Sequence, residues 1–278
     1  IEVARPSERQ NLSEWLGDNI SSPVPSGTPE GHFDMLVAGC GTGQEVVDLA
    51  SVFRDVTIDA FDLSAASLAY AARKISERGL KNVRLEQADI LEMASFPRRY
   101  DIVVASGVLH HLTDPLEGWR LLAGLTKPGS YMLIALYSEI GRHDVSALSA
   151  FGREGGYGTS PEELRRFRAD ILALPKGDGV RNYALNRDDF YNLSMLRDMV
   201  FHVNEHRFTI EKIGKAVTAL GLQFCGFLIE SELRAAFEKK FGKASALSLD
   251  AWSKFEAANP RAFRQMYHFV VSKRPAPH

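Results

Sequence analysis

Asp34-Met35-Leu36-Val37-Ala38-Gly39-Cys40-Gly41-Thr42-Gly43-Gln44-Glu45 is the stretch that decides the fold. A short apolar run comes first, then glycine at every second position, then residues that suit a helix. Glycine allows positive φ angles and lets a ligand approach the backbone closely. The first turn of a helix also offers N–H groups that no helical carbonyl accepts from. The stretch therefore predicts a buried strand that passes through a ligand-binding loop into a helix.

The spacing of the loop excludes the commonest nucleotide-binding motifs. It is Gly-x-Gly-x-Gly, whereas dinucleotide-binding proteins use Gly-x-Gly-x-x-Gly, and Gln44 stands where their third glycine would fall. No Gly-Lys-Ser/Thr follows, so the loop is not a P-loop. Glu45 would repel a pyrophosphate at the start of the helix. An uncharged or cationic ligand segment fits the loop better.

Outward from the loop, strand and helix patterns alternate. Apolar, strand-like runs are expected at residues 33–38, 56–61, 83–87, 100–105 and 131–137. Helix-compatible segments separate them, with Ser64 and Asp114 as expected N-caps of two of these helices. Such alternation with short loops is typical of a parallel sheet covered by helices on both faces. Two later runs, 222–229 and 266–271, bring the predicted sheet to seven strands.

The chain divides into four predicted parts. Residues 1–32 form a polar N-terminal arm, and residues 33–137 form an α/β, Rossmann-like core. Residues 138–207 form a helical insertion after the fifth strand, on the substrate side. Residues 208–278 complete the sheet and carry a second helical insertion between the sixth and seventh strands. Insertions at these places can cover the carboxyl edge of the sheet, where open α/β folds bind ligands.

Composition narrows the class of protein. Of 278 residues, 45% are hydrophobic and 24% charged, as in ordinary globular proteins. The 33 basic and 35 acidic residues nearly cancel, which argues against a nucleic-acid partner. The apolar runs are too short for a membrane span, and two cysteines, Cys40 and Cys225, suit a reducing cytoplasm.

The first residue is Ile1 rather than Met, which suits a chain cut from a longer protein.

Polar residues follow the predicted strands at the edge where ligands bind. Asp62 ends the second strand, nineteen residues after Gly43, where a carboxylate can accept hydrogen bonds from both hydroxyls of a ribose. Asp89 follows the third strand. Ser106 ends the fourth, and the pair His110-His111 comes shortly after it.

These segments, in this order, resemble the successive motifs of class I S-adenosylmethionine-dependent methyltransferases. The resemblance covers roughly residues 33–137. It implies a seven-stranded sheet in which the seventh strand lies antiparallel beside the fifth, and S-adenosylmethionine as the cofactor. The layout also resembles bacterial methyltransferase domains that are sometimes fused to helical repeats.

The resemblance also implies a role for each matching residue. The three loop glycines would surround the methionine part of the cofactor, with Cys40 as a small residue that the loop accepts. Asp62 would hold the ribose, and Leu63 would pack on the adenine. The remaining residues would border the adenine or the sulfonium. The complete predicted cofactor set is Gly39, Cys40, Gly41, Gly43, Asp62, Leu63, Asp89, Ile90, Ser106 and His110.

The candidates for orienting the methyl acceptor or removing a proton from it are His110, His111, Tyr137, His202 and His206. Histidine titrates near neutral pH and suits proton removal. The alternative is that these side chains only orient or pack. Asp198, His202 and His206 are spaced by four, which would align them on one helix. However, Thr209 suits a new N-cap, so a helix break near His202 is expected, and we predict no metal site.

The functional hypothesis is methyl transfer from S-adenosylmethionine to an oxygen or nitrogen of a small molecule or peptide side chain. The acceptor's lone pair would displace the sulfonium sulfur directly. Two alternatives stay open from the sequence: a non-catalytic S-adenosylmethionine-binding module, and a protein methyltransferase domain of a larger chain. A nicotinamide-dependent oxidoreductase would have to tolerate Gln44, Glu45 and the different glycine spacing.

Overall fold

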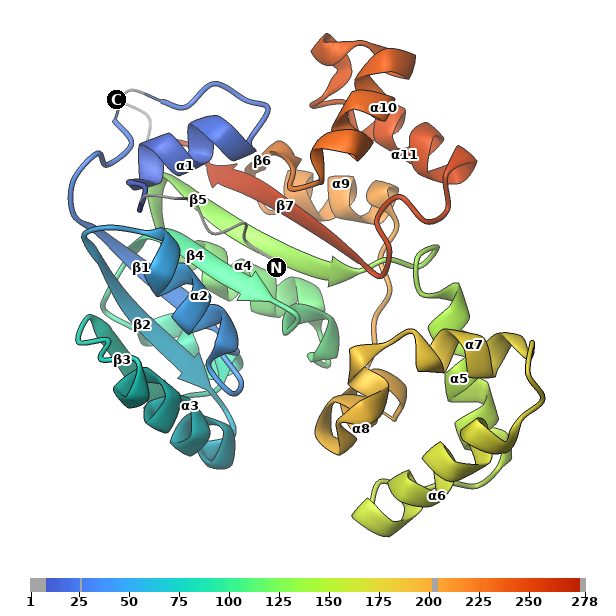
Figure 1. The fold of residues 1–278 in the computed structure, drawn as a ribbon. Helices are drawn as coiled ribbons and strands as arrows, with labels where there is room; N and C mark the ends of the chain where they lie inside the picture. The colour runs from blue at the N-terminus through green and yellow to red at the C-terminus, as the bar shows by residue number, and fades with distance from the viewer. Residues whose placement is uncertain (1–8, 26, 202–204, 276–278) are drawn as a thin grey trace.

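The computed structural model describes residues 9–25, 27–201 and 205–275. They form one seven-stranded sheet with the strand order β3-β2-β1-β4-β5-β7-β6 (Figure 1). Strand β7 runs antiparallel to both of its neighbours, and the other described pairings are parallel. The predicted seven-stranded α/β fold, with the seventh strand antiparallel beside the fifth, is confirmed. The strands are β1 Phe33–Ala38, β2 Val56–Asp62, β3 Val83–Gln87, β4 Tyr100–Ser106, β5 Thr126–Tyr137, β6 Leu222–Phe227 and β7 Met266–Lys273.

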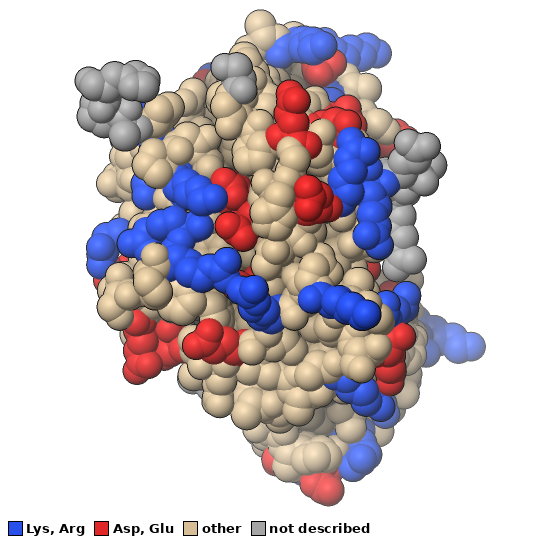
Figure 2. Space-filling view, turned by 90° about the vertical axis from the view of Figure 1, so that its left-hand side faces the viewer, with Lys and Arg blue, Asp and Glu red and all other residues tan. Residues whose placement is uncertain are grey.

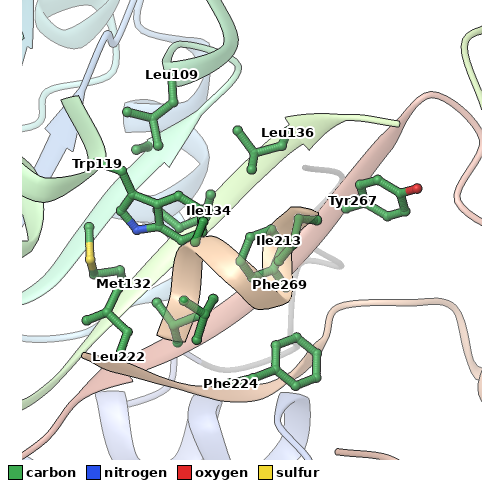
Figure 3. Packing of buried hydrophobic residues seen from close by; sticks show 14 of the residues in the cluster. Leu109, Trp119, Met132, Ile134, Leu136, Ile213, Leu222, Phe224, Tyr267 and Phe269 are labelled. Atoms are coloured by element: carbon green, nitrogen blue, oxygen red, sulfur yellow. The ribbon is translucent and has the colours of Figure 1, made fainter. Parts of the chain in front are cut away.

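The sheet is covered on both faces, and this explains the apolar strands. Parallel strands buried on two sides are apolar nearly throughout, and β1 and β4 are buried along almost their whole length. Helices α1 (Leu12–Asn19), α2 (Gln44–Val52) and α3 (Ala65–Glu77) share one hydrophobic cluster with the sheet. Helices α4 (Pro115–Leu125) and α9 (Ile210–Ala219) share the other. Figure 3 shows this second cluster, in which residues from α4, α9 and strands β5, β6 and β7 interlock.

Local cap chemistry sets where the helices begin. Asp114 accepts hydrogen bonds from the backbone N–H groups of Leu116 and Glu117, with Pro115 in the first helical turn. Ser64 and Thr209 cap α3 and α9 through their hydroxyl oxygens. Each cap satisfies N–H groups that the first helical turn leaves without a partner. These starts were predicted from the sequence.

A group of helices follows β5 in the sequence and precedes α9 and β6. In space it lies beyond the carboxyl ends of β4 and β5 (Figure 1). It has a small core of its own around Phe167, Phe190 and Leu196. None of the described helices is long and apolar enough to cross a membrane. The group consists of α5 His143–Glu154, α6 Pro161–Ala173, α7 Gly179–Leu185, η3 Asp188–Tyr191 and α8 Leu193–Val200. A further pair, α10 Ser231–Phe241 and α11 Leu249–Ala258, precedes β7.

The two chain segments that enter and leave the α5–α8 group run side by side. Ser138 and Phe208 form an isolated parallel bridge. The backbone N–H of Glu139 donates to the Phe208 carbonyl at 2.8 Å, and that of Phe208 donates to the Tyr137 carbonyl at 2.9 Å. We call this pairing the neck of the group.

Some strand ends differ from the predicted ones. Strand β5 begins at Thr126 rather than at residue 131, through Pro128 and Gly129, which looked like a turn. Its pairing with β4 is irregular between Tyr100 and Ile102, which accommodates the extra residues. Strand β7 extends beyond residue 271 because Lys273 pairs with the start of β6. Pairing partners far away in the sequence decide these ends.

Candidate cofactor and acceptor site

The glycine loop follows β1 and shows two different uses of glycine. A Cβ at Gly39 would lie 2.4 Å from the Val108 side chain, and one at Gly43 would lie 2.7 Å from that of Ala71. Both glycines are needed for close internal packing. A Cβ at Gly41 would meet nothing within 4 Å, although its φ of +52° also favours glycine. Gly41 therefore borders open space.

Asp62, at the end of β2, holds the loop in place. Its Oδ2 accepts a hydrogen bond from the Gly41 N–H at 2.7 Å, and its Oδ1 accepts one from the Ser64 N–H at 2.8 Å. The Phe61 carbonyl accepts from the N–H groups of Gly39 and Cys40 as well. A carboxylate offers about four acceptor positions, so Asp62 retains capacity for two hydroxyl donors beside the open space.

Apolar side chains stand exposed after β2 and β3. Leu63 is 66% exposed and Leu91 is 42% exposed, both high for leucine. Asp89 caps the short 3-10 helix η1, Ile90–Ser95, by accepting from the Leu91 N–H at 2.9 Å. Ile90 is buried in the core, so its side chain does not offer the surface that Leu91 does. Ile90 was expected to border the adenine, and Leu91, which was not named from the sequence, is the more exposed of the two side chains.

The end of β4 brings Ser106 close to Glu45 in the first turn of α2. The Ser106 hydroxyl hydrogen-bonds the Glu45 carboxyl. Oε1 of Glu45 is buried and has no hydrogen-bond partner among the described residues. Burial, reinforced by the nearby Asp48 carboxylate and opposed by the Ser106 bond, raises the pKa of Glu45 to about 7. The sequence analysis used Glu45 only to exclude a pyrophosphate.

Cys40 is a packing residue in this arrangement. Its side chain is buried, and burial together with the negative charge of Asp62 raises the pKa of its thiol to about 12. A thiol nucleophile acts as the thiolate, so Cys40 stays protonated and unreactive at neutral pH.

The structure brings together three of the predicted acceptor-side residues, and their rings touch. The rings of His110 and Tyr137 stack with centroids 3.7 Å apart and planes 27° apart. His111 meets Tyr137 edge-on at 5.4 Å and His110 at 4.4 Å. Burial raises the pKa of Tyr137, so its hydroxyl remains a hydrogen-bond donor at neutral pH.

Arg142 completes this cluster from the far side. Its guanidinium carbon lies 3.6 Å from the Tyr137 ring centroid. His110 and Arg142 are both too near that centroid to share one face, so the Tyr137 ring lies between them. We call these three residues the ring stack. Arg142 is only 1% exposed, although arginine is usually a surface residue.

A carboxylate from the neck balances the buried guanidinium. Arg142 donates to both oxygens of Glu205, at 2.7 and 3.1 Å, and to the Met199 carbonyl at 3.2 Å. Arg207 donates to Glu205 as well, at 2.7 Å. Burial raises the pKa of Glu205, but the two guanidinium groups outweigh it and hold that pKa below its usual value. The pair therefore stays ionised at neutral pH.

The other two predicted histidines are placed differently. The backbone N–H of His206 donates to the His110 carbonyl at 2.9 Å, and its side chain is exposed. His202 lies outside the described residues. Helix α8 ends at Val200, as the expected break near His202 requires, so Asp198 and His206 do not share one helix. Among the described residues, no group of three His, Cys, Asp or Glu is placed to hold a metal ion.

Comparisons with known proteins agree with this geometry. A family model described as a methyltransferase domain matches residues 30–154. An uncharacterized protein of Synechococcus sp. is 28% identical over 260 residues, which are 87% of this chain and 61% of that protein. A malonyl-[acyl-carrier protein] O-methyltransferase of Halalkalibacterium halodurans is 33% identical over 106 residues, 37% of this chain and 38% of that enzyme.

The fold is found again among solved structures. PKMT2 from Rickettsia typhi, in complex with AdoHcy, superimposes with a TM-score of 0.65 at 14% identity, covering 98% of this chain and 55% of that one. The chain spans less than two thirds of the length of each of these proteins. The match over residues 30–154 and the strand order agree with each other. This chain contains a methyltransferase domain of the class I S-adenosylmethionine-dependent family.

Proposed function

We propose that this chain transfers a methyl group from S-adenosylmethionine to an oxygen or nitrogen of a small molecule or a peptide side chain. One observation carries the proposal. The open space beside Gly41 is bordered by the Asp62 carboxylate, with exposed leucines following β2 and β3. A nucleoside has the matching surfaces, since its ribose donates hydroxyls and its base is flat and largely apolar.

The cofactor residues then divide by chemistry. Asp62 would accept the ribose hydroxyls, and Leu63 and Leu91 would cover the faces of the adenine. Asp89 would border the base through the carboxylate oxygen that does not cap η1. Gly41 would leave room for the methionine part, while Gly39 and Gly43 hold the loop against its neighbours. Ser106 would lie near the sulfonium end.

The reaction needs alignment more than acid or base strength. When bound, S-adenosylmethionine supplies an electrophilic methyl group. The protein would align the acceptor lone pair with that methyl group and exclude water. Tyr137 would orient the acceptor through its hydroxyl, and His110 or His111 would take a proton from a hydroxyl acceptor. His110 is fully buried, so we favour His111, which is half-buried, for contact with the acceptor.

The α5–α8 group would supply the acceptor side of the pocket. It lies beyond the carboxyl ends of β4 and β5, where a small acceptor or a side chain can enter. The named activity of the Halalkalibacterium relative makes an oxygen acceptor the first to try. Figure 2 shows a band of Lys and Arg with Asp and Glu on both sides, and the formal charge is −2. This mixture favours neither nucleic acid nor membrane as a partner.

The test begins with calorimetric titration of the protein with S-adenosylmethionine and with S-adenosylhomocysteine. We expect micromolar binding of both, and Asp62→Ala should weaken it by about 10- to 100-fold, as expected for charge-assisted hydrogen bonds. Asp55→Ala is the control, since Asp55 is an exposed carboxylate before β2. Acceptors are then screened with a radiolabelled methyl group. A folded protein that binds neither compound would overturn the proposal.

A further inference from the structure

Glu45 stands where the glycine loop, α2 and the end of β4 meet. It occupies the first turn of α2, two residues after Gly43, and its carboxyl reaches the Ser106 hydroxyl at the last residue of β4. Strands β1 and β4 are neighbours, so this carboxyl bridges the carboxyl ends of both. Open space adjoins the same ends, since neither Gly41 nor Gly107 would have a Cβ neighbour within 4 Å.

The Glu45 carboxyl has fewer hydrogen bonds than it can accept. Ser106 supplies one hydrogen bond, and Oε1 is buried with no partner among the described residues. A buried polar atom without a hydrogen bond is costly, and a buried charge costs more unless a counter-charge pairs with it. Among the described residues, the charged group that acts on it is the Asp48 carboxylate on α2, and the nearby thiol of Cys40 stays protonated. Asp48 adds negative charge, and none of the residues that the structure describes supplies a cation to this carboxyl.

We propose that Glu45 recognises the α-ammonium group of the cofactor's methionine part, through the carboxylate oxygen that has no partner. This inference rests on the proposed function, because it takes the open space beside Gly41 as the cofactor site. An ammonium group supplies both the missing hydrogen-bond donor and the missing positive charge. Glu45 is then a specificity-determining residue, which separates ligands that carry an amino-acid end from nucleosides that do not.

Two commercially available nucleosides test this assignment by binding alone. S-adenosylhomocysteine carries the ammonium group, and 5′-methylthioadenosine keeps the nucleoside and sulfur but lacks the amino-acid end. Glu45→Gln should weaken S-adenosylhomocysteine binding by about 10- to 100-fold, the effect of losing a charge-assisted hydrogen bond. The same change should alter 5′-methylthioadenosine binding less than twofold. Calorimetric titration measures both.

A proton readout tests the charge itself. Below pH 7 the free carboxyl is largely protonated, because burial raises its pKa. Pairing with an ammonium group favours the ionised form, so binding should release a proton. Titrations at pH 6 in buffers of different ionisation enthalpy should show this release for the wild-type protein and not for Glu45→Gln. Affinity for S-adenosylhomocysteine should rise from pH 5.5 to 7.5 and then level off.

Asp48→Asn is the matched control. Asp48 lies on the same helix and near the same carboxyl, but its Oδ2 accepts a hydrogen bond from the Gln44 side chain. It should change S-adenosylhomocysteine affinity much less than Glu45→Gln does. Equal losses in the two variants, or equal losses for both ligands in Glu45→Gln, would overturn the assignment.

The outcomes separate this inference from the proposed function. If the wild-type protein binds neither nucleoside, the proposed function fails. If it binds S-adenosylhomocysteine and Glu45→Gln binds it equally well, the cofactor site stands and the role of Glu45 fails. Folding of Glu45→Gln is checked separately by circular dichroism and thermal unfolding, so that a loss of binding of both ligands is read only in a folded variant.

Discussion

The two sides of the site are built in opposite ways. On the proposed cofactor side, backbone groups and carboxylates surround open space, and Oε1 of Glu45 has no partner among the described residues. On the proposed acceptor side, His110, Tyr137 and Arg142 pack against one another, and the Arg142 guanidinium donates to Glu205 and to the Met199 carbonyl. The first side therefore leaves space and an unused hydrogen-bond acceptor, whereas the second is closely packed and its charge is paired.

Removing Arg142 from the closely packed acceptor side should have the largest effect on stability. Arg142→Met should lower the free energy of unfolding by about 3 kcal/mol, because the mostly buried Glu205 carboxylate then keeps only Arg207 as a counter-charge. Urea denaturation measures the change. Lys254→Met, which removes an exposed pair with Asp250, should cost less than about 0.5 kcal/mol. If the two variants lose similar free energies of unfolding, the buried ion pair of Arg142 contributes no more than an exposed one.

A double variant sharpens this result. If the cost of Arg142→Met comes from an unpaired charge, then adding Glu205→Gln should restore part of the stability. If the double variant is no more stable than Arg142→Met, the loss arises from the missing contact with Tyr137 instead. In that case the stacking of Arg142 on the Tyr137 ring, and not the ion pair with Glu205, would account for the lost stability.

A side chain placed in the open space beside Gly41 should affect ligand binding more than stability. Gly41→Val should weaken S-adenosylhomocysteine binding by about 10- to 100-fold, because the new side chain occupies space that the ligand needs. Gly79→Val is the matched control: Gly79 also has positive φ and open space around a Cβ, but it lies after α3. Both changes strain the backbone by about 2 kcal/mol. Equal binding losses would count against a ligand beside Gly41.

The smallest expected effect lies in the pH dependence of stability. Glu45 has a raised pKa of about 7 in the folded protein, so the folded state binds more protons than the unfolded state between about pH 4.5 and 7. Its contribution to stability therefore falls as the pH rises through this window. Glu45→Gln should remove this fall, which amounts to about 1–3 kcal/mol, the upper figure corresponding to the full shift of the pKa. Identical pH profiles of stability for the two proteins would mean that the carboxyl titrates normally.

The cofactor side could be predicted largely from sequence because its determinants are local. The glycine loop, Asp62 and the caps at Ser64 and Asp114 are each defined by a few consecutive residues. Strands β1 and β3 have the predicted bounds, since their ends coincide with turn residues. The place of β7 beside β5 followed from the resemblance, because no local pattern states which strands pair.

The acceptor side could not be predicted in the same way. His110 and Tyr137 were named separately, but their stacking depends on how β4 and β5 pair. Arg142 and Glu205 are sixty-three residues apart and meet only because the chain returns at the neck. No spacing rule connects them. Leu91 was not named because the sequence does not say which side chains of the short helix after Asp89 stay exposed.

The neck gives the molecule a modular character. Because its two segments pair at Ser138 and Phe208, the α5–α8 group leaves and rejoins the sheet at nearly one place. Closing so short a gap with a linker costs little chain entropy. The group can then be exchanged for another without re-routing the strands, provided that the replacement supplies a partner for Tyr137. If the α5–α8 group selects the acceptor, as proposed, chimaeras cut at this point should change the acceptor while keeping the same methyl donor.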